Sequence, residues 1–174
     1  MFLTILCNHQ KQVKEPQVPG RRYRYMTTTN TLHVSMNKLL SSLEVFYHKL
    51  QSYHWYVKGH AFFTVHAQLE SYYDEVKEEV DEVAETLLMI GGKPVSTLNE
   101  FLKLSKVTEG EDTYVSASEL LPKVRDDFAL IRDLALDVKA SADREGNALV
   151  SAKMDDLVAS ASKAVWMISQ SLMD

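Results

Sequence analysis

The sequence contains few residues that interrupt helices or cross-link a chain. Its 174 residues include one cysteine, four prolines and six glycines. The single cysteine, Cys7, cannot form an internal disulfide or a zinc ribbon, which excludes a disulfide scaffold and favours a reducing compartment. Glycine and proline fall in clusters that are separated by long stretches free of helix breakers. This distribution is typical of a protein built from long helices.

Long hydrophobic runs are also missing. No stretch reaches the ~18 apolar residues that a membrane span needs, and the short apolar start lacks the basic flank of a secretion signal. Hydrophobic residues make up 45% of the chain and charged residues 25%, which excludes a disordered acidic protein. The composition therefore predicts a cytoplasmic globular protein of about one domain, with no membrane contact.

Positive charge is concentrated at the N-terminus. Residues 1–26 carry +4 and the other 148 residues carry −9, within a net charge of −5. A basic tail on an acidic body can reach a polyanion that the body itself would repel. The alternative is that translation starts at Met26 and that the tail is absent from the native product. If the tail is functional, its candidate DNA-binding residues are Lys11, Lys14, Arg21, Arg22 and Arg24.

Four stretches carry apolar residues at alternating spacings of three and four, the pattern of an amphipathic helix. Gly91, Gly92 and Pro94 predict where the second helix ends, and Ser118 is the expected N-cap of the third. The four predicted helices cover residues 31–58, 62–90, 117–142 and 147–173.

The connection from Gly91 to about Val115 is too long for a hairpin, so it is expected to run the length of a bundle. Residues 96–103 predict a short helix within it, and no strand pattern competes. The predicted fold class is therefore all-α: a ferritin-like four-helix bundle over residues 27–174, with up-down-down-up helices and a short helix in the crossover between helices two and three. Residues 1–26 form the predicted flexible tail.

A polar stripe runs beside the apolar stripe of the second predicted helix. His66, Glu70, Asp81 and Glu85 share one flank, within about 100° of arc around the axis. Imidazole and carboxylate groups together are a ligand set for iron, manganese or zinc. The stripe therefore presents candidate metal ligands.

These candidates cannot all reach one metal ion within a single chain, because His66 and Asp81 lie about 22 Å apart along the helix. A two-fold dimer with its axis near Val76 would place the His66/Glu70 pair of one chain against the Asp81/Glu85 pair of the other. His54, on the apolar stripe of the first helix, is the expected third contributor beside His66. The interpretation therefore predicts two identical sites between subunits.

Two simpler interpretations compete with a metal site. A charged helix stripe is most often a solvated surface with salt bridges, and a lone histidine on an apolar stripe is most often a core residue. The Glu-x-x-His motif of intrachain di-iron bundles is absent from the sequence. A metal site in this protein is therefore expected to differ from the intrachain di-iron site of those bundles.

The sequence resembles the Dps family, the miniferritins named as DNA-binding proteins from starved cells. The resemblance covers residues 31–174 and rests on HWYVKGHAFFTVHAQLE (54–70), DEVAETLLMIGGKPVSTLNEFL (81–102) and VWMISQSL (165–172). It implies a hollow dodecamer of two-fold dimers that oxidises Fe(II), typically with hydrogen peroxide, and stores Fe(III) oxide. It further implies iron ligands His54, His66 and Glu70 from one subunit, and Asp81 and Glu85 from its partner.

Two positions depart from the family pattern. The family usually has Asp at the position of Glu70, so the extra methylene moves this carboxylate by about one bond length and affects metal affinity or oxidation rate. The ion-entry pores of the family are lined by acids near the start of the fourth helix, a region that here contains Arg144 and Lys153.

The leading hypothesis is a cytoplasmic, nucleoid-associated ferroxidase that binds DNA without sequence specificity and spares it from Fenton radicals. The alternative is a DNA-compacting nucleoid protein with an impaired or absent ferroxidase. A third possibility is a helical protein whose dimer seam merely contains polar residues.

Overall fold

The computed structural model describes residues 30–173, and five helices and two very short strands lie within them. The long helices follow the apolar periodicity of the sequence, and the short helix lies in the connection between the second and third of them. The elements are α1 (Thr31–Tyr56), β1 (Val57–Lys58), α2 (Phe62–Met89), α3 (Leu98–Leu104), β2 (Val115–Ser116), α4 (Ala117–Glu145) and α5 (Ala148–Ser171).

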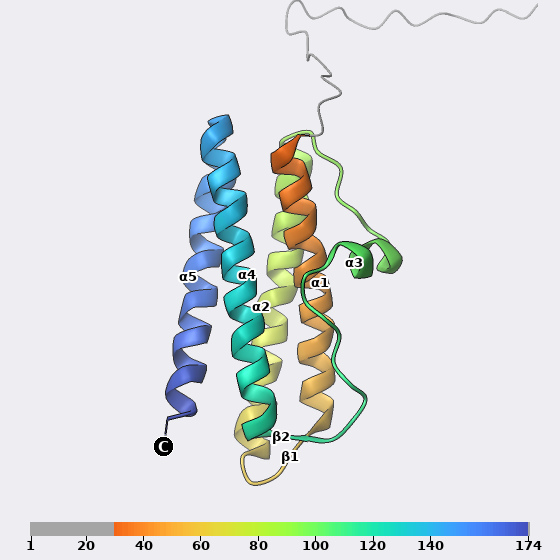
Figure 1. Ribbon diagram of the computed structural model, residues 1–174, viewed down its shortest axis with the longest axis vertical. Coiled ribbons are helices and arrows are strands. Elements are labelled where there is room, and N and C mark those ends of the chain that lie inside the picture. The colour runs from red at the N-terminus through yellow and green to blue at the C-terminus, as the bar shows by residue number, and fades with distance from the viewer. Residues whose placement is uncertain (1–29, 174) are drawn as a thin grey trace, which may run out of the picture.

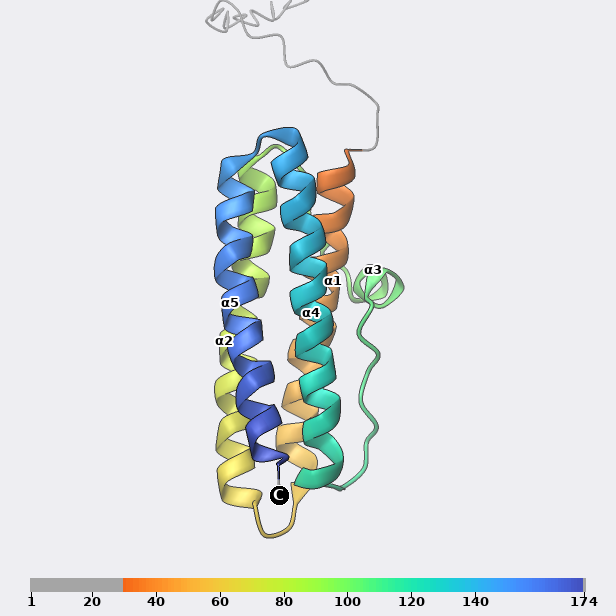
Figure 2. The ribbon, with the colours of Figure 1, turned by 60° about the vertical axis from the view of Figure 1, so that its left-hand side comes forward.

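The four long helices form a bundle in which α1 and α2 are antiparallel neighbours, as are α4 and α5 (Figure 1). The long connection returns the chain from the end of α2 to the opposite end of the bundle, so α2 and α4 run in the same direction. Figure 2 shows α4 beside α1, and α5 lies along α2, where Lys153 of α5 pairs with Glu82 of α2. The predicted up-down-down-up bundle with a helix in its crossover is therefore confirmed.

Most helix ends carry the local signals that stop or start a helix. The Asn30 side chain caps α1 by accepting from the backbone N–H groups of Leu32 and His33. Ser116, rather than the predicted Ser118, is the N-cap of α4, because it forms a capping box with Glu119. The prediction for Ser118 was wrong: the S-x-x-E spacing begins two residues earlier.

The core lies between all four long helices and is almost entirely aliphatic, with an aromatic cluster at mid-height. Phe46 of α1 meets Phe128 of α4 edge-to-face at a centroid distance of 4.8 Å, and Tyr72 of α2 meets the same ring at 5.0 Å. These contacts join three helices at one level of the bundle. None of the helices in residues 30–173 is both long and apolar enough to cross a membrane.

The crossover is attached to α1 along its length. The Asn37 side chain donates to the Lys93 carbonyl and accepts from the Val95 N–H, at 3.1 and 2.8 Å. Farther along, β2 pairs in parallel with β1, and Val115 lies opposite Val57. The sequence did not predict this two-residue pairing. It fixes the end of the crossover beside the turn that joins α1 to α2.

Candidate metal centre

His54 and His66 face each other across the turn between α1 and α2. Their rings stack at a centroid distance of 3.6 Å and an interplanar angle of 20°. Each Nδ1 is hydrogen-bonded to the backbone carbonyl of the other residue, at 2.9 Å from His54 and 2.8 Å from His66. A carbonyl only accepts, so each Nδ1 carries a proton, and Nε2 is the ring nitrogen that can offer a lone pair. That lone pair is the one a metal ion requires.

The local chain path produces this pairing. His54 lies in the last turn of α1, and the chain reverses at Gly59, whose φ of +101° favours glycine. α2 then begins at Phe62 and brings His66 back level with His54. His54 is 9% exposed and His66 is half-buried. The pair is therefore held by the fold, at the edge of the core.

Glu70 lies one helical turn beyond His66 on α2 and is exposed. Its Oε1 accepts a hydrogen bond from the Tyr73 hydroxyl at 3.3 Å. The half-buried Tyr73 ring meets the His54 ring edge-to-face at 5.4 Å. Partial burial, together with the neighbouring Glu70 and Asp74 carboxylates, raises the pKa of Tyr73, so this hydroxyl remains a donor at neutral pH.

Asp81 and Glu85 are not brought to the histidine pair within the chain. Both are exposed on α2, and the helix separates Asp81 from His66 by about 22 Å along its axis. Among residues 30–173, no three His, Cys, Asp or Glu side chains gather into a group that could hold a metal ion. The chain thus carries a histidine pair, the Glu70 carboxylate one helical turn beyond it, and a separate carboxylate pair farther along α2.

Two aromatic neighbours of the pair were not singled out from the sequence. Phe62 stacks against His66 at 4.9 Å, and Tyr73 contacts both His54 and Glu70. Both residues lie on the apolar stripe of α2, so their spacing alone is that of core residues. The i, i+3 spacing of Glu70 and Tyr73 permits a contact between them, but many other pairs on α2 share that spacing.

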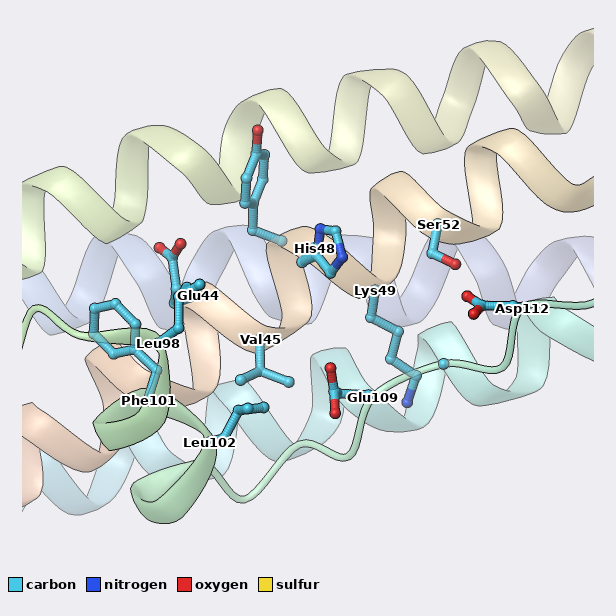
Figure 3. A pocket seen from close by; sticks show the side chains of 12 residues that line it. Glu44, Val45, His48, Lys49, Ser52, Leu98, Phe101, Leu102, Glu109 and Asp112 are labelled. Atoms are coloured by element: carbon cyan, nitrogen blue, oxygen red, sulfur yellow. The ribbon is translucent and has the colours of Figure 1, made fainter.

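A groove of about 350 Å³ lies elsewhere, between α1, α3 and the crossover (Figure 3). Its walls include Val45 and His48 of α1 and Phe101 of α3. None of the five predicted metal ligands lines it. The candidate centre is therefore defined by the histidine pair and not by a deep pocket.

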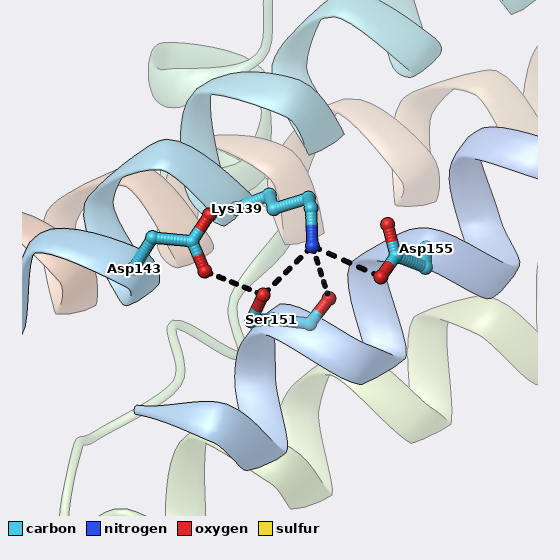
Figure 4. A network of polar contacts seen from close by, with 4 residues as sticks. All are labelled: Lys139, Asp143, Ser151 and Asp155. Carbon is cyan, nitrogen blue, oxygen red and sulfur yellow. Dashed lines mark hydrogen bonds and ion pairs between the residues drawn. The ribbon is translucent and has the colours of Figure 1, made fainter. Parts of the chain in front are cut away.

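Acidic side chains around the start of α5 form hydrogen bonds and an ion pair with other residues of α4 and α5. Lys139 Nζ donates to Ser151 Oγ at 2.8 Å and to Asp155 Oδ2 at 2.9 Å, and Ser151 Oγ donates to Asp143 at 2.6 Å (Figure 4). Arg144, noted in the sequence as a departure from an acidic pore, donates to Ser141 Oγ. Two of the local carboxylates are thus bound to a lysine and a serine of the same chain.

The predicted DNA-binding residues of the tail, Lys11, Lys14, Arg21, Arg22 and Arg24, lie outside the described residues. Their role stays a prediction.

The helix order and long crossover are those of the ferritin-like class, and residues 35–174 match the family model described as a ferritin-like domain. The DNA protection during starvation protein of Listeria innocua is 36% identical over 145 residues, which span 82% of this chain and 93% of that protein. General stress protein 20U of Bacillus subtilis is 35% identical over 136 residues, which span 77% of this chain and 92% of that protein.

Solved structures agree with this assignment. A Dps structure from Staphylococcus aureus superposes with a TM-score of 0.79 at 33% identity, covering 82% of this chain and 95% of that one. A Dps structure from Vibrio cholerae superposes with a TM-score of 0.79 at 29% identity, covering 82% of this chain and 89% of that one. That protein is described as a member of a broad superfamily of ferritin-like diiron-carboxylate proteins. The chain belongs to the Dps family.

Proposed function

We propose that this protein is an iron-oxidising and iron-storing miniferritin that protects DNA. In this proposal, dodecamers built from two-fold dimers bind Fe(II) at the dimer seams, oxidise it with hydrogen peroxide and retain Fe(III) oxide in the hollow interior. The DNA protection during starvation proteins among the relatives and the diiron-carboxylate description of the Vibrio cholerae protein support this assignment.

The observation that carries the proposal is the division of ligands along α2. His66 and Glu70 lie near the start of α2, and His54 of α1 stacks on His66. Asp81 lies about 22 Å from His66 along the same helix, and Glu85 follows one turn later. An antiparallel two-fold partner would place its Asp81 and Glu85 opposite the histidine pair and complete two equivalent sites. Each completed site would hold two neutral imidazoles and three carboxylates, a donor set suited to iron.

Two Fe(II) ions at such a site supply one electron each to hydrogen peroxide. The O–O bond breaks, and the oxygens take up two protons and leave as two water molecules, while both ions become Fe(III). The protein residues hold the two ions close together and balance part of their charge with carboxylates. A two-electron reduction of this kind releases no hydroxyl radical, which is the basis of the proposed DNA protection.

Complementation between two defective variants tests whether the site lies between subunits. One variant is His54→Ala/His66→Ala and the other is Asp81→Ala/Glu85→Ala; each alone should lose peroxide-dependent Fe(II) oxidation and remain folded. Refolded together at equal amounts, half of the dimers are mixed and hold one intact site of two, so about a quarter of wild-type oxidation should return. The ferric absorbance reports the rate.

Size-exclusion chromatography of each variant is the control for assembly. A mixture that regains nothing above the separate variants would contradict an intersubunit centre, because only shared sites can be restored by mixing. Wild-type oxidation rates in either pure variant would contradict the assigned ligands.

A further inference from the structure

Tyr73 occupies a fixed place beside the histidine pair. Its ring is half-buried on α2 and meets two rings of α1 edge-to-face, Tyr47 at 6.1 Å and His54 at 5.4 Å. Such contacts restrict the ring to one orientation. The hydroxyl is therefore presented at a defined point on the surface of α2.

That hydroxyl meets the carboxylate of one of the five candidate metal ligands. Tyr73 Oη donates to Glu70 Oε1 at 3.3 Å, across one turn of the same helix. A glutamate side chain has one more rotatable bond than an aspartate, so fixing its carboxylate costs more conformational entropy. A hydrogen bond from a fixed donor reduces the number of positions that this carboxylate samples before a metal ion binds.

We infer that Tyr73 is a positioning residue that holds the Glu70 carboxylate for metal binding through Oε2. This inference rests on the proposed function and adds one residue to it. Oε1 accepts the tyrosine hydroxyl, and Oε2 is the oxygen without this partner.

The test separates the hydroxyl from the ring. Tyr73→Phe removes only the donor and keeps both edge-to-face contacts. We expect it to weaken anaerobic Co(II) binding about five-fold, as loss of one ordinary, solvent-exposed hydrogen bond would. The visible absorption of bound Co(II) reports the isotherm without any oxidation. The half-saturating Fe(II) concentration for oxidation should rise by a similar factor, with the maximal rate nearly unchanged.

Two neighbouring tyrosines provide matched controls. Tyr72→Phe removes a hydroxyl from the adjacent residue, whose ring packs on Phe128, and Tyr47→Phe removes the hydroxyl of the ring that supports Tyr73. Neither hydroxyl bonds to Glu70, so neither change should shift the Co(II) isotherm by more than about two-fold. A shift in these controls equal to that of Tyr73→Phe would overturn the inference.

A second background tests the coupling directly. The carboxylate of Glu70→Asp lies one C–C bond, about 1.5 Å, nearer the backbone and away from the Tyr73 hydroxyl. Tyr73→Phe should then cost less than two-fold in Co(II) affinity when Glu70→Asp is already present, whereas an equal cost in both backgrounds would refute the coupling. Wild-type protein that binds no Co(II) would overturn the proposed function itself, and wild-type binding that Tyr73→Phe leaves unchanged would overturn only the role of Tyr73.

Discussion

Lys49 of α1 and Asp127 of α4 form an ion pair inside the bundle, with Lys49 Nζ 2.7 Å from Asp127 Oδ2. Their side chains are only 6% and 13% exposed. Burial raises the pKa of Asp127, and the neighbouring Lys49 charge opposes this shift without cancelling it. The pair links α1 to α4 at a place where both side chains are largely shielded from water.

Lys49→Met should therefore destabilise the protein strongly, because it leaves a buried carboxylate without its cation. We expect a loss of about 3 kcal/mol in the free energy of unfolding, measured by urea denaturation. The double variant Lys49→Met/Asp127→Leu should recover most of this loss, since the buried charge is gone. A single variant as stable as the wild type would show that the pair contributes nothing.

Glu79 of α2 gives the fold a dependence on pH. The pKa of Glu79 is raised from 4.5 to about 7. Burial is the largest cause, and the negative charges of Glu82 and Asp156 add to it, while the positive charge of Lys153 on α5 partly opposes the shift. Lys153 itself pairs with Glu82. The folded state therefore holds a proton on Glu79 that the unfolded chain releases near pH 4.5, and stability falls as pH rises from about 4.5 to about 7.

Glu79→Gln should remove this dependence. At pH 8 the variant should be more stable than the wild type by about 1 kcal/mol, a figure reduced for partial exposure to solvent, and at pH 4.5 the two should be nearly equal. Thermal denaturation at the two pH values measures the difference. If the difference in stability between Glu79→Gln and the wild type is the same at both pH values, the effect comes from packing and not from protonation.

The basic tail is expected to carry DNA binding, because the remainder of the chain bears −9 and should repel phosphate. A chain that starts at Met26 should assemble and oxidise iron normally but lose DNA binding at low salt. For the full chain, each tail neutralises up to about five phosphates at a log–log salt slope of ~0.9 each, and many tails on one particle add avidity. If the truncated chain still shifts DNA in a gel, the DNA-binding surface lies on the helical bundle and not on the tail.

The turn between α4 and α5 depends on Gly146, which ends α4 in the left-handed region at φ +67°. Gly146→Ala should cost about 1 kcal/mol of stability because an L side chain is strained there. Gly110→Ala is the matched control: its φ is not positive, and the added Cβ would meet Tyr53 at an ordinary 3.5 Å. Equal losses of melting temperature in the two variants would contradict a backbone cause.

The bundle could be predicted from the sequence because its signals are local. Apolar spacing located each long helix to within a few residues, and Gly91 with Gly92 marked the end of α2. The β1–β2 pairing could not be found in this way, because two residues show no periodicity. The pairing of Lys49 with Asp127 was also missed, since its partners are far apart in the chain.

The candidate centre was partly predictable for the same reason. Helical spacing placed His66 and Glu70 on one flank of α2 and separated them from Asp81, and the structure places His54 against His66. Spacing alone could not show that each ring bonds to the backbone of the other. It also could not separate Tyr73, which bonds to Glu70, from an ordinary core aromatic.

The reciprocal hydrogen bonds of His54 and His66 have a consequence for the order of folding. They join residues only twelve positions apart, within one helical hairpin, and contacts of short sequence separation form early. The β1–β2 pairing closes a much longer loop, from Val57 to Val115, and is expected to form later. The histidine pair should therefore be in place on a newly made chain before the crossover is attached to it.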